Sequence, residues 1–278
     1  MIDLYRFVKE EHLESFLNGD LYMSSLGYFW SHGFEGQNDI FEGVCEAQDP
    51  QTTQIQEPVR SAIKGSVLFR MNAYQYCNML CFYKHKVDLK RKQTTVFGEE
   101  MKKFGDYAIR ILDPEIFITR LQMYAEDRDD YFLAGSVHYH RRDEVTDQLD
   151  CFDKMQKYAA QKEWRVAYVS DFKKKQDIAK NNPTSTFEEA LTVKIGDIRS
   201  LTEVYKVDNL IASPLNVYRG FKIVDTISGE DEKLFSNVGL PHSTPWYEDE
   251  YHGWGDRATF QNKVMELDGG RMGLMFSI

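Results

Sequence analysis

The residues best suited to catalysis lie in two short stretches that are far apart in the chain. Glu163 begins a segment rich in β-forming residues, and Gln161 lies two positions earlier, so both share one strand face if the strand extends that far. A carboxylate at a strand start, beside a side-chain amide, can project into a cleft. The alternative is a surface glutamate that pairs with a lysine or an arginine.

Arg6 is the second candidate, because it lies between Tyr5 and Phe7 in a short apolar segment. Strand alternation directs the two aromatic rings to one face and Arg6 to the other. An arginine in a central strand is typical where its guanidinium binds a carboxylate or a phosphate. The alternative is an arginine on an exposed face of the sheet.

Other motifs exclude several classes of site. The chain has no phosphate-binding loop, no glycine-rich dinucleotide fingerprint and no zinc-protease motif. Cys77 and Cys81 share a strand face without a second cysteine pair, which favours a place in the core. His138 and His140 also share a face, but no third ligand is suitably spaced. We therefore predict no metal site.

The elements that must position these residues are mainly strands. Residues 4–8 and 20–26 predict strands on either side of a helix over 9–17, which Asn18-Gly19 ends. Further strands are predicted at 67–70, 77–83, 107–112, 132–139 and 163–169, helices at 115–121 and 148–161, and a long, functional loop at 33–58. Many strands with few, irregularly spaced helices predict an α+β fold.

The C-terminal region differs in composition. We predict a domain over residues 1–225 and a loosely attached extension over 226–278 that packs on it. Within the extension, 245–254 holds four aromatic residues and three carboxylates. Two interpretations remain open: a loop that folds its rings over the sheet, or a docking segment that covers the cleft or binds a regulatory partner.

Composition and charge limit the classes of function. The 278 residues are 42% apolar, which excludes disorder of the whole chain, and no apolar run is long enough for a transmembrane helix. The four cysteines and the lack of a signal peptide predict a cytoplasmic protein without membrane contact. The net charge of −10 argues against a general nucleic-acid coat. Basic clusters at 84–86, 90–92, 138–142 and 173–175 nevertheless predict a local basic surface, with Tyr83 and Tyr139 as base-stacking candidates.

The order of these features resembles the ADP-ribosyltransferase family. An arginine in the first strand, a following strand with Ser24 and Ser25, and much later a Gln-x-Glu motif at 161–163 carry the resemblance over residues 1–170. Leu4-Tyr5-Arg6-Phe7, Asn38-Asp39-x-Phe41-Glu42 and Lys162-Glu163-Trp164-Arg165 are also similar to an uncharacterised bacterial family found at phage-defence loci. The resemblance implies split antiparallel β-sheets with flanking helices around a cleft for nicotinamide adenine dinucleotide (NAD).

The same resemblance implies roles for individual residues. Glu163 would stabilise the oxocarbenium-like transition state, and Gln161 would orient the acceptor. Tyr28, or another aromatic residue such as Phe29 or Trp30, would stack on nicotinamide. Arg6 would bind the phosphates or the adenosine ribose. The other implied NAD-binding residues are Tyr5, Ser24, Ser25, Asn38 and Asp39. NAD would be the substrate, and no metal is implied.

We therefore expect an NAD-dependent ADP-ribosyltransferase, a toxin of antiphage defence that modifies a nucleic acid, with RNA favoured, and that an antitoxin or other inhibitory protein restrains. A protein ADP-ribosyltransferase or an NAD glycohydrolase is the first alternative. The second is a non-enzymatic α+β binding module. That module predicts Glu163 buried in an ion pair with Arg165 or Arg6, with no adjoining cleft.

Overall fold

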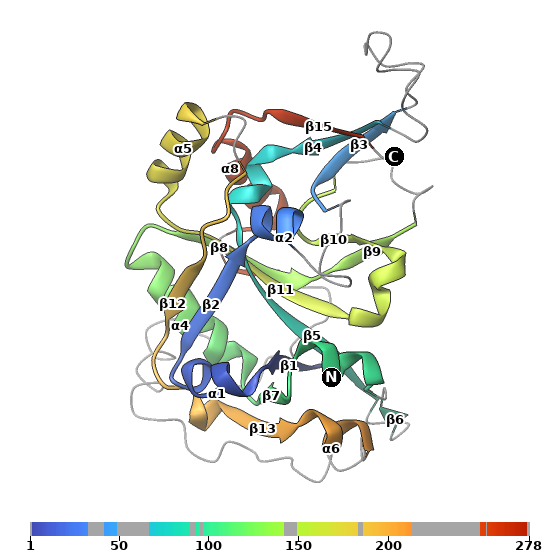
Figure 1. The fold of residues 1–278 in the computed structure, drawn as a ribbon. Helices are drawn as coiled ribbons and strands as arrows, with labels where there is room; N and C mark the ends of the chain where they lie inside the picture. Colours follow the sequence, from blue (N-terminus) through green and yellow to red (C-terminus); the bar gives the residue numbers. More distant parts are fainter. Residues whose placement is uncertain are drawn as a thin grey trace.

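The computed structural model describes residues 2–32, 42–48, 67–88, 93–94, 97–141, 149–182, 186–212, 251–253 and 255–276. These residues form a mixed α+β fold, which confirms the predicted class (Figure 1). Asn38 and Asp39 lie outside the described residues, as do 90–92, 213–250 and the predicted domain boundary at 225.

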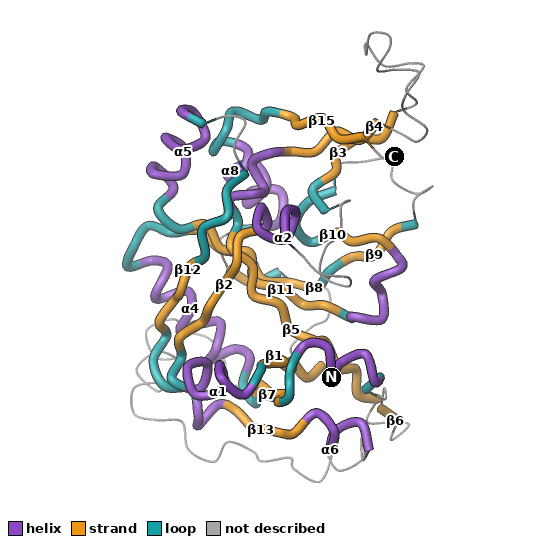
Figure 2. The backbone as a smooth tube through the Cα atoms, viewed as in Figure 1, coloured by secondary structure: helices purple, strands orange, loops and turns teal. Residues whose placement is uncertain are grey.

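The largest sheet in the described part of the chain has ten strands, and all its strand pairs are antiparallel. Figure 2 shows the strands in orange and the helices in purple. Its path runs β13-β7-β1-β5-β11-β8-β14, and β2, β12 and β6 branch from it. The strands are β1 Ile2–Val8, β2 Asp20–Ser25, β5 Asn78–Asp88, β6 Gln93–Thr94, β7 Tyr107–Ile111, β8 Tyr131–Ser136, β11 Glu163–Val169, β12 Leu191–Lys194, β13 Thr202–Lys206 and β14 His252–Gly253.

Two smaller sheets adjoin it. β3 Val44–Gln48, β4 Val67–Met71 and β15 Met272–Phe276 form one, and β9 His138–His140 pairs in parallel with β10 Asp153–Met155 in the other. The helices are α1 Glu10–Leu17, α2 Leu26–His32, α4 Pro114–Glu126, α5 Phe172–Asn181, α6 Val207–Ala212 and α8 Arg257–Met265. Short 3₁₀ helices lie at η1 Asn72–Tyr76, η2 Glu99–Phe104, η4 Gln156–Gln161 and η5 Arg199–Leu201.

One edge of β5 is shared by two strands that do not meet there. β11 pairs along residues 78–83 of β5 on its other edge. On the shared edge, β1 pairs with residues 83–86 of β5, and β2 pairs with residues 78–79. β1 and β2 therefore diverge beside residues 80–82 of β5, and we call this divergence the fork.

The core lies on both faces of the sheet, as alternation along the strands requires. Leu80 and Val166 pack in a cluster with Phe117 of α4 on one face, and Met79 and Ala167 join a second cluster on the other. α4 begins where the Asp113 side chain accepts a hydrogen bond from the backbone N–H of Ile116.

Most predicted elements near the site are confirmed, but two predictions are wrong. The described residues 149–161 do not form the predicted α-helix. Asp150 accepts a hydrogen bond from the backbone N–H of Phe152, Asp153 accepts one from that of Asp150, and β10 and the 3₁₀ helix η4 follow. Such local bonds offer the backbone an alternative to a helix. The predicted loop at 33–58 contains strand β3, and its other residues, apart from 42–43, lie outside the described residues.

The described C-terminal residues are not loosely attached. β15 pairs with β4 along five residues, and Phe260, Val264 and Leu267 are buried in the core. The ring of Tyr251 packs edge-on against Phe152, with 5.2 Å between the two ring centroids. This contact agrees with the first interpretation of the aromatic segment, a loop that folds its rings over the sheet. The preceding residues of that segment lie outside the described part of the chain.

Candidate functional site

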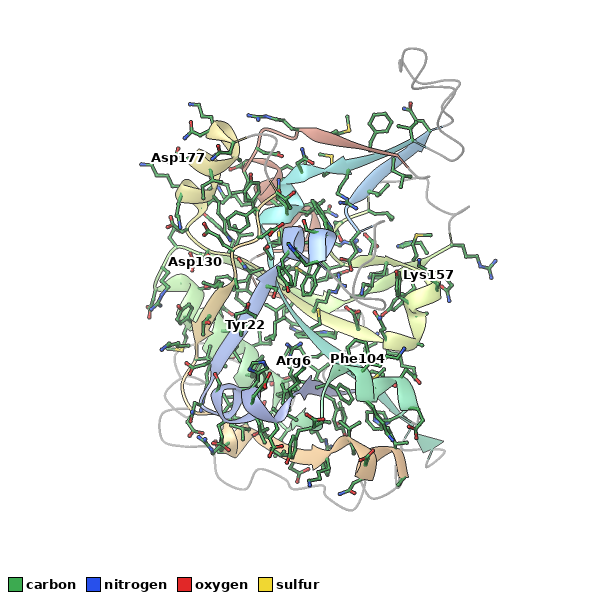
Figure 3. All side chains as sticks on the ribbon, in the orientation of Figure 1. Arg6, Tyr22, Phe104, Asp130, Lys157 and Asp177 are labelled. Atoms are coloured by element: carbon green, nitrogen blue, oxygen red, sulfur yellow. The ribbon has the colours of Figure 1, made fainter. Side chains whose placement is uncertain are left out.

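A cavity of about 310 Å³ lies at the fork, where β1 and β2 separate along β5. The predicted site residues that line it come from β1, β2, α2, η4 and β11: Tyr5, Arg6, Ser24, Tyr28, Gln161 and Glu163. In the view of Figure 3, the lining residue Arg6 lies between Tyr22 and Phe104, which also line the cavity. The fold thus brings the predicted site residues of the N-terminal strands and those around residue 163 to one cavity.

Arg6 reaches into the fork because β1 has left β5 at this position. Its Nη1 donates a hydrogen bond of 2.7 Å to the backbone carbonyl of Cys81, in the middle of the fork. Its Nε is buried and has no hydrogen-bond partner among the described residues. Burial lowers the pKa of the guanidinium, and the charge of Glu163 partly offsets this effect. A guanidinium with an unused buried donor is suited to an anionic ligand.

Glu163 is held by two cations. Lys154 Nζ lies 2.6 Å from Oε1, and Arg165 Nε lies 2.6 Å from Oε2. Burial alone would raise the pKa of the carboxyl group, but Arg165 and Lys154 lower it to about 2. Glu163 is therefore ionised at neutral pH, and its backbone N–H donates to the hydroxyl of Tyr139.

Glu42 completes this cluster of buried charges, and sequence analysis had assigned it no role. Its Oε1 lies 2.5 Å from Arg165 Nη2 and 3.5 Å from Lys154 Nζ. Lys154 was missed as well, since it lay in the wrongly predicted helix. Arg165 was named only as an ion-pair partner of Glu163 in the non-enzymatic alternative, and it shares a strand face with Glu163 two residues earlier.

Gln161 lines the cavity from a position different from the predicted one. β11 begins at Glu163, and Lys162 adopts a left-handed conformation with φ of 43°, so Gln161 ends η4 instead of extending the strand. Its Oε1 accepts a hydrogen bond of 2.9 Å from Lys154. Lys154 therefore connects the two members of the predicted Gln-x-Glu motif.

The serines and tyrosines predicted for the site differ in burial and in whether they line the cavity. Ser24 lines the cavity, whereas Ser25 is not among the described residues that line it. Ser25 is buried, its Oγ donates to the carbonyl of Phe187, and it accepts from the backbone N–H of Tyr28 at the start of α2. Tyr28 is 39% exposed and stacks on His32, while Tyr5 is fully buried with its ring edge-on to Phe97.

Two of the predicted basic clusters are partly buried, and the cluster at 90–92 lies outside the described residues. His85 is buried and stacks on Phe97 at 4.6 Å, and Tyr83 is buried in the same aromatic cluster. Lys175 is also buried, and its ammonium donates to the Tyr76 carbonyl and to Asn78 Oδ1. Burial removes Tyr83, His85 and Lys175 from any nucleic-acid surface.

The described residues show no metal site, hold free thiols and include no membrane-spanning helix. No group of three or more His, Cys, Asp or Glu side chains in them is arranged to hold a metal ion; His140 pairs with Asp153, and His138 with Tyr251. Cys77 and Cys151 are buried free thiols. None of the helices in this part of the chain has the length and apolar character needed to cross a membrane.

Comparisons of the chain with protein-family models, with curated proteins and with solved structures found no match.

Proposed function

We propose that the fold is of the ADP-ribosyltransferase type and that the cavity binds NAD for transfer of its ADP-ribose group. This proposal depends on one observation: Arg6 and Glu163, the first and the last residue of the motifs that carry the resemblance, line the same cavity of about 310 Å³. The fork between β1 and β2 supports the split sheet that the resemblance implies.

The charges around the cavity suit a dinucleotide. Arg6, Lys154 and Arg165 supply three positive charges against the two carboxylates of Glu42 and Glu163, which leaves an excess of one positive charge. Since the buried Nε of Arg6 is unused among the described residues, the pyrophosphate of NAD would find a donor there.

The reaction breaks the bond between C1′ of the ribose and the nicotinamide nitrogen, and the electron pair leaves with nicotinamide. The acceptor then forms a bond to C1′ and gives up its proton. Because Glu163 is ionised and largely buried, its charge would stabilise the oxocarbenium-like state, and its oxygens have lone pairs left for a ribose hydroxyl.

For the acceptor we propose an unpaired nucleobase, with RNA favoured. Tyr22 and Tyr28 line the cavity and are 59% and 39% exposed, so their rings are available to stack on a base at its mouth. The Gln161 amide can hydrogen-bond a base edge. The resemblance would make such an enzyme an antiphage toxin that an inhibitory protein restrains.

The test incubates the protein with NAD labelled in the ADP-ribose part, together with RNA, single-stranded DNA or protein extract. Nicotinamide release and label on RNA are expected. Label on protein alone would contradict the nucleic-acid acceptor, and free ADP-ribose alone would identify a glycohydrolase. No nicotinamide release under any condition would contradict the enzyme.

One observation favours the second candidate, a binding module without catalysis. Glu163 is paired with Arg165, as that alternative predicts, although a cavity adjoins the pair. Calorimetry beside the nicotinamide-release assay separates the two candidates. A binding module would bind a nucleotide in calorimetry but would release no nicotinamide.

A further inference from the structure

Glu42 and Glu163 share the same two cations, and neither carboxylate has a cation to itself among the described residues. Arg165 bridges them, with Nε on Glu163 and Nη2 on Glu42. Lys154 also contacts both, at 2.6 Å from Glu163 and 3.5 Å from Glu42. The four charges sum to zero, and the side chains of Lys154, Arg165 and Glu42 are each less than 5% exposed.

This arrangement bears on the charge that Glu163 can offer to a bound ligand. Two cations at hydrogen-bond distance offset much of the field of one carboxylate, since screening by water is weak in a buried site. Glu42 carries the charge that balances the second cation. Without it, Glu163 would lie in a cluster of net charge +1, which opposes the positive charge that develops on the ribose.

We infer that Glu42 is a positioning residue of the site: by sharing Arg165 and Lys154 with Glu163, it leaves Glu163 the negative charge needed to stabilise the oxocarbenium-like state. This inference rests on the proposed function. It adds a residue that acts through its neighbours and does not require contact with NAD.

The test compares Glu42→Gln with the double variant Glu42→Gln/Lys154→Met in the nicotinamide-release assay. Glu42→Gln makes the cavity more positive, so kcat should fall by about 30-fold while KM for NAD stays constant or decreases. The double variant restores a neutral Glu163–Arg165 pair and should regain at least about tenfold in kcat. A purely structural role would instead raise KM, and the second substitution would not restore activity.

Glu203→Gln provides the control, because Glu203 pairs with Arg110 and is not among the described residues that line the cavity. Its kcat should equal that of the wild type. Melting temperatures of all variants show which chains are folded at the assay temperature. An unchanged kcat in Glu42→Gln, or a double variant no better than the single one, would overturn the inference while leaving the proposed function intact. A wild-type protein without nicotinamide release would overturn both.

Discussion

The Glu163 carboxylate combines a proposed catalytic role with a structural one, so its substitution has two expected effects. Glu163→Gln should lower nicotinamide release by about 100-fold or more, because the charge that stabilises the transition state is lost. It should also lower the free energy of unfolding by about 3 kcal/mol, because Arg165 and Lys154 lose a buried counter-charge. Wild-type turnover in the variant would rule out the catalytic assignment.

Asp3→Asn separates the two effects. Asp3 pairs with Arg110 at 3.1 Å, and its side chain is 10% exposed, against 11% for Glu163. It is not one of the described cavity-lining residues. The control should therefore lose stability but keep its activity at temperatures below its melting point.

The pH dependence of stability gives an independent measurement on Glu163. Its pKa falls from 4.5 to about 2 on folding, so its contribution to stability is complete above pH 4.5 and is lost as the pH falls toward 2. The stability difference between wild type and Glu163→Gln should shrink over this interval in denaturant titrations. A difference that stays constant down to pH 2 would contradict the ion pairs.

Cys81 lines the same cavity, but we expect it to be unreactive. Burial, together with the nearby charge of Glu163, raises the pKa of its thiol to about 11, so little thiolate exists at pH 7.5. Mass spectrometry should find the Cys81 peptide largely unmodified after brief iodoacetamide treatment of the native protein and fully modified after unfolding. Rapid labelling of the native thiol would show that the site is more polar than described.

Helix α5 is attached to the sheet by a buried lysine, and this attachment should depend on pH. Burial lowers the pKa of Lys175 to about 8 from 10.5, so the folded protein binds fewer protons than the unfolded chain between these values. Stability should therefore rise with pH over this interval, by up to about 3 kcal/mol. Lys175→Met should lack the rise in parallel chemical denaturations at pH 7.5 and 10. An equal pH response in both proteins would contradict a buried ammonium.

The elements that carry the site differ in how far the sequence predicts them. β1, α1, β2 and β11 follow from local periodicity and a glycine stop, and this is why Arg6 and Glu163 could be placed on strands. The fork could not be predicted, because it depends on which residues of β5 pair with β1 and which with β2. Such long-range register leaves little trace in one sequence.

The residues of the site also differ in whether the sequence indicates them. Arg165 has a local signal, its two-residue spacing from Glu163. Lys154 has none, because the carboxylates of Asp150 and Asp153 replace the predicted helix by a turn and a strand. Glu42 reaches Arg165 only through the tertiary fold, so neither periodicity nor composition indicates the contact.

Helix α8 contributes buried side chains to the core and β15 pairs with β4, so a chain that lacks both elements should not fold. Ending the chain at Thr244 removes α8 and β15, including the buried residues Phe260 and Val264 and the Arg257 guanidinium that pairs with Asp150. We expect aggregation, measured by size-exclusion chromatography, whereas a chain ending at Phe276 should elute like the full protein. A folded product ending at Thr244 would contradict the core role of these elements and favour docking.

The pairing of Arg257 with Asp150 and Asp153 also has a consequence for synthesis on the ribosome. β1 is synthesised before its partners and needs β5 and then β11 before Arg6 and Glu163 can line one cavity, and long-range pairing of this kind forms slowly. The turn that leads to Lys154 gains its ion pairs with Arg257 only when α8, which follows it in the chain, has been synthesised. A chain that has not yet reached α8 would therefore lack the ion pairs that hold this turn beside the cavity, and under the proposed function a cell would be protected from its incomplete copies.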